Sequence, residues 1–195
     1  LQEWGVVKTV RGNGIFVEMD KNGIQEVQVP PRLIACHVRR YLDTLELLTL
    51  TVEGAAACAV PNVTQSDIET AKAEIGRLWN EDYLYGRTPA VLLDFITEHL
   101  GVEALGAIYA QLRRNLRIGR SIPGLLTTEK TPVNCAIHEQ CSAALHALST
   151  GNQEAFPAET VRAFTRIYRL VLEECGRLGY LESAMKAYDG TALWK

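Results

Sequence analysis

Residues 33–59 read LIACHVRRYLDTLELLTLTVEGAAACA, and this stretch gives the clearest indication of the fold class. It is long and largely apolar, and Pro61 follows shortly after its end. Proline lacks a backbone N–H and clashes with the preceding helical turn, so it marks the place where a helix stops. We therefore expect one long helix from Leu33 to Ala59.

A second helix is predicted directly after this proline, within TQSDIETAKAEIGRLW at residues 64–79. Ser66 is followed three residues later by Glu69, the pattern of a capping box, and Asp67 suits the positive end of the helix dipole. Its apolar positions recur at helical spacing, which gives this helix one face for the core. The expected face consists of Ile68, Ile75, Leu78 and Trp79.

Helical patterns continue through the rest of the chain. Thr88-Pro89 is a favourable helix start, and Gly101 is a favourable end. Further helices are expected over Val102–Ile118, Pro132–Leu148 and about 158–178, with a loop from Gly119 to Thr131. Helices of this number and length predict a mainly α fold, an antiparallel bundle of six to seven helices.

The first thirty residues have a different pattern. Val6–Val10 and Ile15–Met19 are expected to be strands on either side of Gly12-Asn13-Gly14, a turn that can adopt the positive φ angles of a tight hairpin. Ile24–Val29 can form a third strand or begin a linker. The predicted organisation is a β-hairpin in residues 1–20, a linker over 21–32 and an all-helical domain over 33–195.

Composition limits the classes of function. The 195 residues suffice for one compact domain, or for a domain and a fragment of another. The formal net charge of −3 gives no global electrostatic case for a nucleic-acid or membrane partner. No apolar run reaches the length of a membrane span, and the five cysteines follow no C-x-x-C spacing. We expect free thiols, a cytoplasmic location and no membrane partner.

Four segments resemble one known family. LQEWGVVKTVRGNGIFVEM at residues 1–19 resembles the last part of the winged-helix domain in GntR-type bacterial repressors. Residues 52–75, 99–120 and 141–156 resemble, in the same order, helices of the effector-binding FCD domain of the FadR subfamily. The resemblance implies a ligand-responsive transcriptional regulator of which this chain is mainly the effector-binding and dimerisation domain.

The same resemblance implies that the hairpin is the wing of a DNA-binding module whose helix-turn-helix lies upstream of Leu1. Such a wing contacts phosphates, while the recognition helix reads base edges. The expected DNA contacts are Lys8, Arg11, Gly12, Asn13 and Gly14, and they add salt-sensitive affinity with little specificity. The alternative is a solvated hairpin with ordinary surface cations.

Many FCD domains hold a metal on an Asp and a His of one helix and a His on each of two later helices. The matching positions in this chain are Pro89, Leu93, Cys141 and either Ala163 or Phe164. Only the cysteine is a metal ligand by its chemistry, and one thiolate does not make a site. The resemblance therefore implies no metal and no other cofactor.

Apolar residues at those positions imply a dry bundle centre and an apolar or amphipathic effector, such as an acyl-CoA. Arginines can bind its carboxylate or phosphate through paired hydrogen bonds. The alternative for these arginines is a solvated helix end. The residues expected to bind the effector are Leu93, Arg113, Arg117, His138, Cys141 and Phe164.

Such repressors bind two half-sites, so the resemblance also implies a homodimer. Two other classes stay open. One is a helical-bundle enzyme or a rearranged metal site; the other is an interaction module with a solid core. The enzyme is not expected, because no nucleophile–base spacing or phosphate loop is present. It would use Asp94, Glu98, His99, His138 and Cys141.

Overall fold

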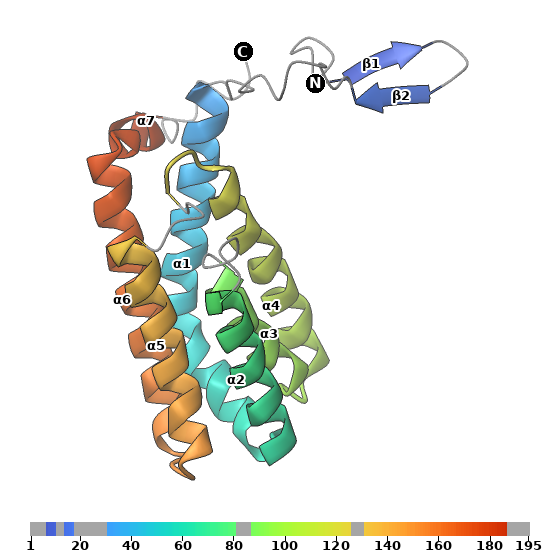
Figure 1. Cartoon of the computed structure of the whole chain (residues 1–195), viewed down its shortest axis with the longest axis vertical. Coiled ribbons are helices and arrows are strands. Elements are labelled where there is room, and N and C mark those ends of the chain that lie inside the picture. The colour runs from blue at the N-terminus through green and yellow to red at the C-terminus, as the bar shows by residue number, and fades with distance from the viewer. Residues whose placement is uncertain (1–6, 11–13, 18–30, 81–86, 126–130, 187–195) are drawn as a thin grey trace.

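The computed structural model describes residues 7–10, 14–17, 31–80, 87–125 and 131–186 (Figure 1). These ranges form seven α-helices, two short 3-10 helices and one pair of strands. In chain order the elements are β1 (Val7–Val10), β2 (Gly14–Val17), α1 (Pro31–Ala59), η1 (Val60–Asn62), α2 (Gln65–Asn80), α3 (Thr88–Glu98), α4 (Glu103–Leu116), η3 (Arg117–Ser121), α5 (Pro132–Ser149), α6 (Ala155–Arg177) and α7 (Tyr180–Lys186). The expected mainly helical fold is confirmed.

The two strands form an antiparallel pair. Val7 lies opposite Val17, and Val10 lies opposite Gly14. Within the described residues, β1 covers 7–10 of the expected 6–10, and β2 begins at Gly14, one residue before the expected segment 15–19; residues 6, 18 and 19 lie outside the described ranges. The turn at 11–13 and the alternative third strand at 24–29 lie outside the residues that the structure describes.

Helix α1 is central to the bundle. It packs against α6 and α7, and it also contacts α3 and α4, while α5 packs against α6 and α2. Figure 1 shows these helices running along the long axis of the molecule. The packing follows from sequence, because Val38, Leu45, Leu48 and Val52 recur on one side of α1 and are fully buried.

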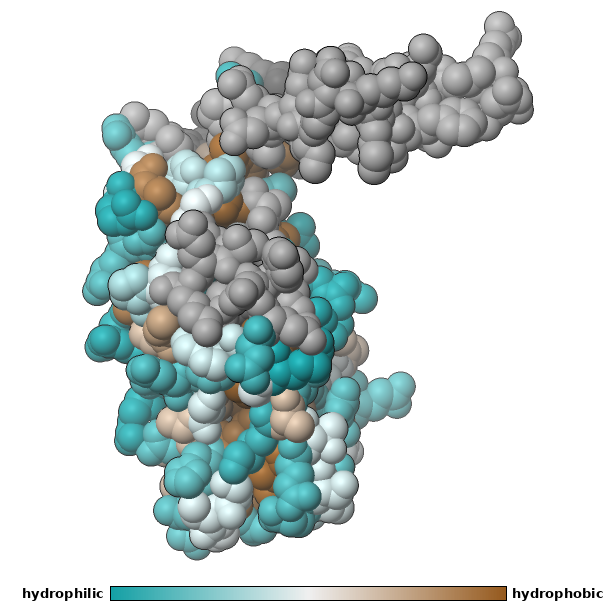
Figure 2. All heavy atoms as spheres, in the orientation of Figure 1, coloured by the Kyte–Doolittle hydropathy of each residue, from teal (hydrophilic) through white to brown (hydrophobic). Residues whose placement is uncertain are grey.

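All seven helices contribute to one continuous cluster of buried apolar side chains. The face of the molecule in Figure 2 is mostly polar, with apolar side chains mainly in seams between helices. Burial of apolar stripes is the dominant favourable contribution to folding in such a bundle.

Two predicted helix ends are fixed by glycine. Gly101 after α3 and Gly151 after α5 have φ angles of 64° and 77°, in the left-handed region that favours glycine. A Cβ atom at Gly101 would also lie 3.1 Å from Nδ2 of Asn62. These glycines therefore set the tight turns into α4 and α6.

Three predicted boundaries are wrong by a few residues. Helix α1 begins at Pro31, within the segment 21–32 assigned to a linker, because proline is tolerated in a first helical turn. Helix α6 begins at Ala155 rather than near 158, with Pro157 also in its first turn. Residues 117–121 form η3 instead of continuing α4 and opening a loop at Gly119.

One helix, Arg32–Asn62, is long and apolar enough to cross a membrane by length and composition alone. The expected absence of an uninterrupted apolar run of this length holds, because charged residues such as Glu46 and Glu53 interrupt the segment. Less than half of the most apolar stretch is buried inside the bundle. Its buried side packs as the core helix of a helical bundle does, and the absence of a membrane partner stays a prediction.

Candidate functional site

Three predicted effector residues lie in the interior. Leu93 of α3, Cys141 of α5 and Phe164 of α6 are fully buried and belong to the same apolar cluster. Burial raises the pKa of the Cys141 thiol far above its ordinary value, because a thiolate would be deprived of water. These positions are therefore apolar and dry, and Cys141 is a protonated core thiol rather than an activated nucleophile.

His138 lies beside this cluster, one turn before Cys141 on α5. Its ring stacks on that of Trp79 from α2, with centroids 4.2 Å apart and an interplanar angle of 25°. Burial lowers the pKa of His138 from its ordinary value of 6.5, so the ring is neutral at pH 7. Nε2 lies 3.5 Å from Oγ of Ser142, at the limit of a hydrogen bond.

The other ring nitrogen of His138 has an unmet requirement. Nδ1 is buried and has no hydrogen-bond partner among the described residues. A buried polar atom without a partner costs about 1–3 kcal/mol, so buried polar atoms in proteins are usually paired with protein, water or ligand. The seam between α2 and α5 therefore contains one buried ring nitrogen without a partner among the described residues, in a ring that stacks on Trp79.

The predicted arginines lie elsewhere. Arg113 forms a two-pronged ion pair with Asp94 of α3: Nη2 donates to Oδ2 at 2.7 Å, and Nε contacts Oδ1. The hydrogen bond from Arg113 to Asp94 raises the pKa of the guanidinium. Arg117 is exposed at the start of η3. The structure therefore does not join Arg113 and Arg117 to the interior residues in one site.

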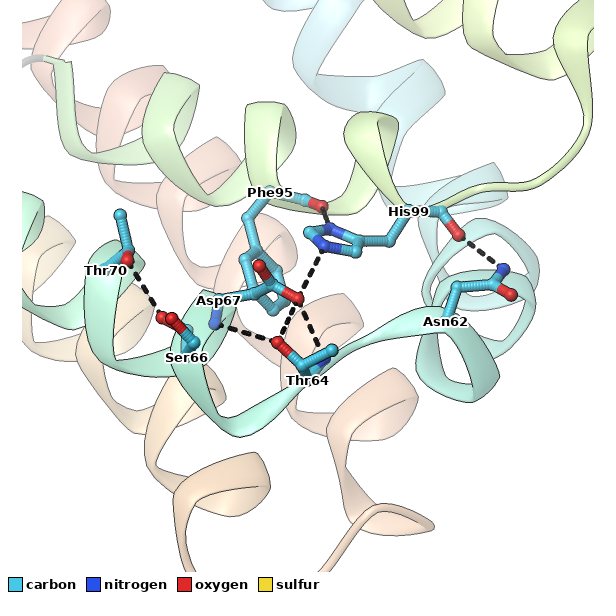
Figure 3. Close-up of polar contacts among 7 residues, drawn as sticks. All are labelled: Asn62, Thr64, Ser66, Asp67, Thr70, Phe95 and His99. Carbon is cyan, nitrogen blue, oxygen red and sulfur yellow. Dashed lines mark hydrogen bonds and ion pairs between the residues drawn. The ribbon is translucent and has the colours of Figure 1, made fainter.

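Figure 3 shows a polar network at the junction of η1, α2 and α3. The Asp67 carboxylate accepts hydrogen bonds from the backbone N–H and the hydroxyl of Thr64, at 2.8 and 2.6 Å. In return, Oγ1 of Thr64 accepts from the backbone N–H of Asp67 at 3.3 Å. These reciprocal bonds are a capping box at Thr64 and Asp67, so the predicted box at Ser66 and Glu69 is wrong by two residues.

His99 connects this cap to the end of α3. Nε2 lies 3.2 Å from Oδ2 of Asp67, and Nδ1 lies 2.7 Å from the carbonyl oxygen of Phe95 (Figure 3). The carbonyl of His99 accepts a hydrogen bond from Nδ2 of Asn62 at 2.8 Å. Hydrogen bonds from Thr64, with a smaller contribution from His99, lower the pKa of Asp67 from its ordinary value of 3.8. The network holds the α1–α2 connection against α3.

The residues of the enzyme or metal alternative are thus distributed over separate contacts. Asp94 pairs with Arg113, His99 pairs with Asp67, and His138 stacks on Trp79. Within the described ranges, no group of three or more His, Cys, Asp or Glu side chains is arranged to hold a metal ion. The alternative therefore lacks a common centre in this part of the chain.

A groove that the sequence did not reveal lies between α1 and α4. Its volume is about 320 Å³, and its lining is almost entirely apolar. One hydrogen bond crosses it, from the hydroxyl of Tyr109 to Oγ1 of Thr51 at 3.0 Å. The lining residues are Leu47, Thr51, Gly54, Ala55, Cys58, Leu105, Ile108, Tyr109 and Leu112.

The predicted DNA contacts are only partly within the described structure. Lys8 lies in β1 opposite Phe16, and Gly14 begins β2 opposite Val10. Arg11, Gly12 and Asn13 lie outside the described residues.

Comparison of the chain with models of known families, with curated proteins and with solved structures yields no match.

Proposed function

We propose that this chain is the effector-binding part of a ligand-responsive, GntR-type transcriptional regulator, which binds DNA as a homodimer. The observation that carries the proposal is the order of the elements. An antiparallel strand pair that includes Lys8 comes first, and a bundle of seven α-helices follows it. This order agrees with the wing and the FCD domain that the sequence resembles.

In this proposal the β1–β2 pair is the wing. Its cationic turn, with Arg11 and Asn13, contacts phosphates, and a helix upstream of the wing reads base edges. The turn contributes affinity that falls as salt rises, because phosphate contacts release counterions. Arg11→Ala in the full-length regulator should therefore lower the affinity for operator DNA and for non-operator DNA by similar factors.

The effector is proposed to bind at the seam of α2 and α5. His138 supports this site because its buried Nδ1 has no partner among the described residues and its ring is neutral. When Nε2 accepts a hydrogen bond from the hydroxyl of Ser142, the proton of the neutral ring is on Nδ1. Nδ1 can then donate a hydrogen bond to a carbonyl group of the ligand. An acyl chain would then lie against Trp79 and the neighbouring apolar core.

This placement favours a neutral polar group, such as a thioester carbonyl, over a free carboxylate at this point of the site. Arg113 is committed to Asp94, so it is not the proposed anion contact. A ligand that fits one arrangement of α2 and α5 better than another shifts the bundle between conformations. The shift would change the spacing of two wings and thereby the operator affinity.

Fluorescence of Trp79 provides the test. The chain has three tryptophans, and Trp4→Phe with Trp194→Phe leaves Trp79 as the single reporter. Titration with a long-chain acyl-CoA should give a saturable change in emission. His138→Phe keeps the aromatic stack but removes the nitrogen, and it should weaken binding about tenfold, the value of one hydrogen bond in a dry site.

His146→Phe is the matched control, because it changes an exposed histidine of the same helix. It should leave the titration unchanged. An emission that does not respond to any acyl-CoA, or equal binding by the His138→Phe variant, would contradict this effector site.

A further inference from the structure

The ring of His99 faces a hydrogen-bond acceptor at each of its two nitrogens. Nδ1 lies 2.7 Å from the carbonyl oxygen of Phe95, and Nε2 lies 3.2 Å from Oδ2 of Asp67 (Figure 3). A neutral imidazole has an N–H on one nitrogen and a lone pair on the other, whereas the imidazolium ion has an N–H on both. Both contacts are therefore hydrogen bonds only when the ring is protonated and positively charged.

Neither acceptor can become a donor to suit a neutral ring. The Phe95 oxygen is a backbone carbonyl, one helical turn before His99. The Asp67 carboxylate is ionised at neutral pH, since hydrogen bonds from Thr64 lower its pKa below the ordinary 3.8. Whichever nitrogen keeps the single proton of a neutral ring, the other points a lone pair at an oxygen. The side chain of His99 is only 15% exposed, so water replaces a lost partner poorly.

The charges around the ring come from few groups. Among the described residues, the one ion pair recorded for His99 is that with Asp67 of α2. On α3 itself, Glu98 precedes the ring in sequence and is exposed. The cation that α4 presents to α3 is Arg113, and its charge is balanced by the carboxylate of Asp94. The protonation state of this one ring therefore controls its contact with α2.

A second contact at this junction does not depend on the proton. Nδ2 of Asn62 donates to the backbone carbonyl of His99 at 2.8 Å. A side-chain amide and a backbone carbonyl keep these roles whether or not the ring is charged. The end of η1 therefore stays attached to α3. Helix α2 begins three residues later, at Gln65, so its first turn can separate from α3 while η1 remains in place.

We propose that His99 is a proton-dependent clamp, which holds the first turn of α2 against the end of α3 when its ring is protonated and releases it when the ring is neutral. Histidine side chains change their charge between about pH 5 and about pH 8, so this is the range in which such a clamp responds. Helix α2 carries Trp79 near its other end. The clamp therefore sets the freedom of a helix that borders the proposed effector site, although it needs no effector to operate.

A double-mutant cycle at two pH values is the test. Asp67→Asn removes the charge but keeps an oxygen that can accept from the Thr64 N–H, and His99→Gln removes the titrating ring. Urea denaturation of the wild type, the single variants and the double variant gives the coupling between the two side chains, and contributions of the other histidines cancel. We expect a coupling of about fivefold in the unfolding equilibrium constant at about pH 5, and almost none at about pH 9. Coupling that is equal at both pH values, or absent at both, overturns the proposal.

Glu69 provides the matched control. It is exposed on α2, two residues after Asp67, and its carboxylate accepts a hydrogen bond from Gln65 rather than from His99. The cycle that combines His99→Gln with Glu69→Gln should show no coupling at either pH. Coupling as large as that with Asp67 would mean that the ring responds to the general charge of α2, and the specific clamp would then be wrong.

Nitrogen NMR of the histidine rings detects the proton directly. It uses the wild type, so it is decisive even where a variant fails to fold. In the folded chain at about pH 5, Nδ1 and Nε2 of His99 should both have the chemical shift of a protonated nitrogen. On titration to about pH 9, the amide resonances of Thr64 and Asp67 should shift together with the ring. A neutral His99 ring at about pH 5, or amides that do not follow the ring, contradicts the clamp.

These measurements contain neither DNA nor an acyl-CoA. A failed clamp therefore leaves the Trp79 titration as a separate test of the effector site, and a failed titration leaves the clamp standing.

Discussion

The two sides of α1 carry similar side chains in very different surroundings. Leu45, Leu48 and Val52 on the inner side are fully buried within the bundle. Leu47 and Leu50 alternate with them along the same helix, and both are exposed. The comparison shows that the inner side specifies the fold of one chain, while the outer side has apolar surface in excess of what the fold uses.

The largest expected effect comes from a matched pair of substitutions on these two sides. Leu48→Ala removes a fully buried side chain, leaves a cavity, and should lower the free energy of unfolding by about 3 kcal/mol. Leu50→Ala removes an exposed side chain and should change it by less than about 0.5 kcal/mol. Urea denaturation at a concentration that keeps the chain monomeric measures both, and equal losses would remove the distinction between the sides.

The packing orientation of α1 also depends on the cap that follows it. Thr64→Ala deletes the oxygen that accepts from the Asp67 N–H and should cost about 1 kcal/mol of unfolding free energy. Ser66→Ala is the control, and it should have little effect because Ser66 lies inside α2. Thermal unfolding of the two variants decides which residue is the cap. A larger loss of stability for Ser66→Ala than for Thr64→Ala would support the capping box at Ser66 and Glu69 that the sequence predicts.

A smaller gain is expected at Gly54 on the outer side. Gly54→Ala adds a methyl group where nothing lies within 4 Å, and it should stabilise the monomer by about 0.5–1 kcal/mol. Gly151→Ala is the contrasting variant, because φ of 77° strains any residue with a Cβ, and it should destabilise the chain. Chemical denaturation of the monomer measures both. Destabilisation by Gly54→Ala under those conditions would mean that the chain itself already covers the outer side.

The smallest effect concerns the partly buried ring of His138. Burial lowers the pKa of His138 in the folded chain below the ordinary 6.5. Below pH 6.5 the unfolded chain binds a proton at this ring more readily than the folded chain, so stability falls as pH decreases. His138→Phe should make the loss of stability between pH 7 and pH 5 shallower. Denaturation midpoints across this range measure it, and parallel pH profiles for both proteins would show that the ring is hydrated.

The sequence pattern was sufficient to predict the helical fold, because the spacing of apolar residues and the residues that end helices act locally. Gly101 and Gly151 end helices where the sequence predicts, since only glycine readily adopts their φ angles. The capping box was misplaced because two overlapping patterns, at Thr64 and at Ser66, fit the same rule. Only the position of the first helical turn decides between them.

The candidate sites were harder to predict from the sequence than the fold. Leu93, Cys141 and Phe164 are buried, as the expected apolar centre requires. Arg113, predicted to bind the effector, instead forms an ion pair with Asp94 on the neighbouring helix α3. Such long-range pairs depend on how helices pack, and no local pattern encodes them. The groove was missed for the same reason: periodicity shows that α1 is apolar on both sides, and only the packed bundle shows which side stays exposed.

The most direct test of the difference between the two sides uses Cys58, which is exposed within the groove on the outer side of α1. With Cys36→Ser and Cys135→Ser, the remaining thiols Cys141 and Cys175 are buried, so a maleimide compares one outer thiol with two inner thiols. We predict that Cys58 is labelled rapidly in the folded chain, and that Cys141 and Cys175 are labelled only after urea unfolds it. A Cys58 that is protected as strongly as the two buried thiols would contradict the account.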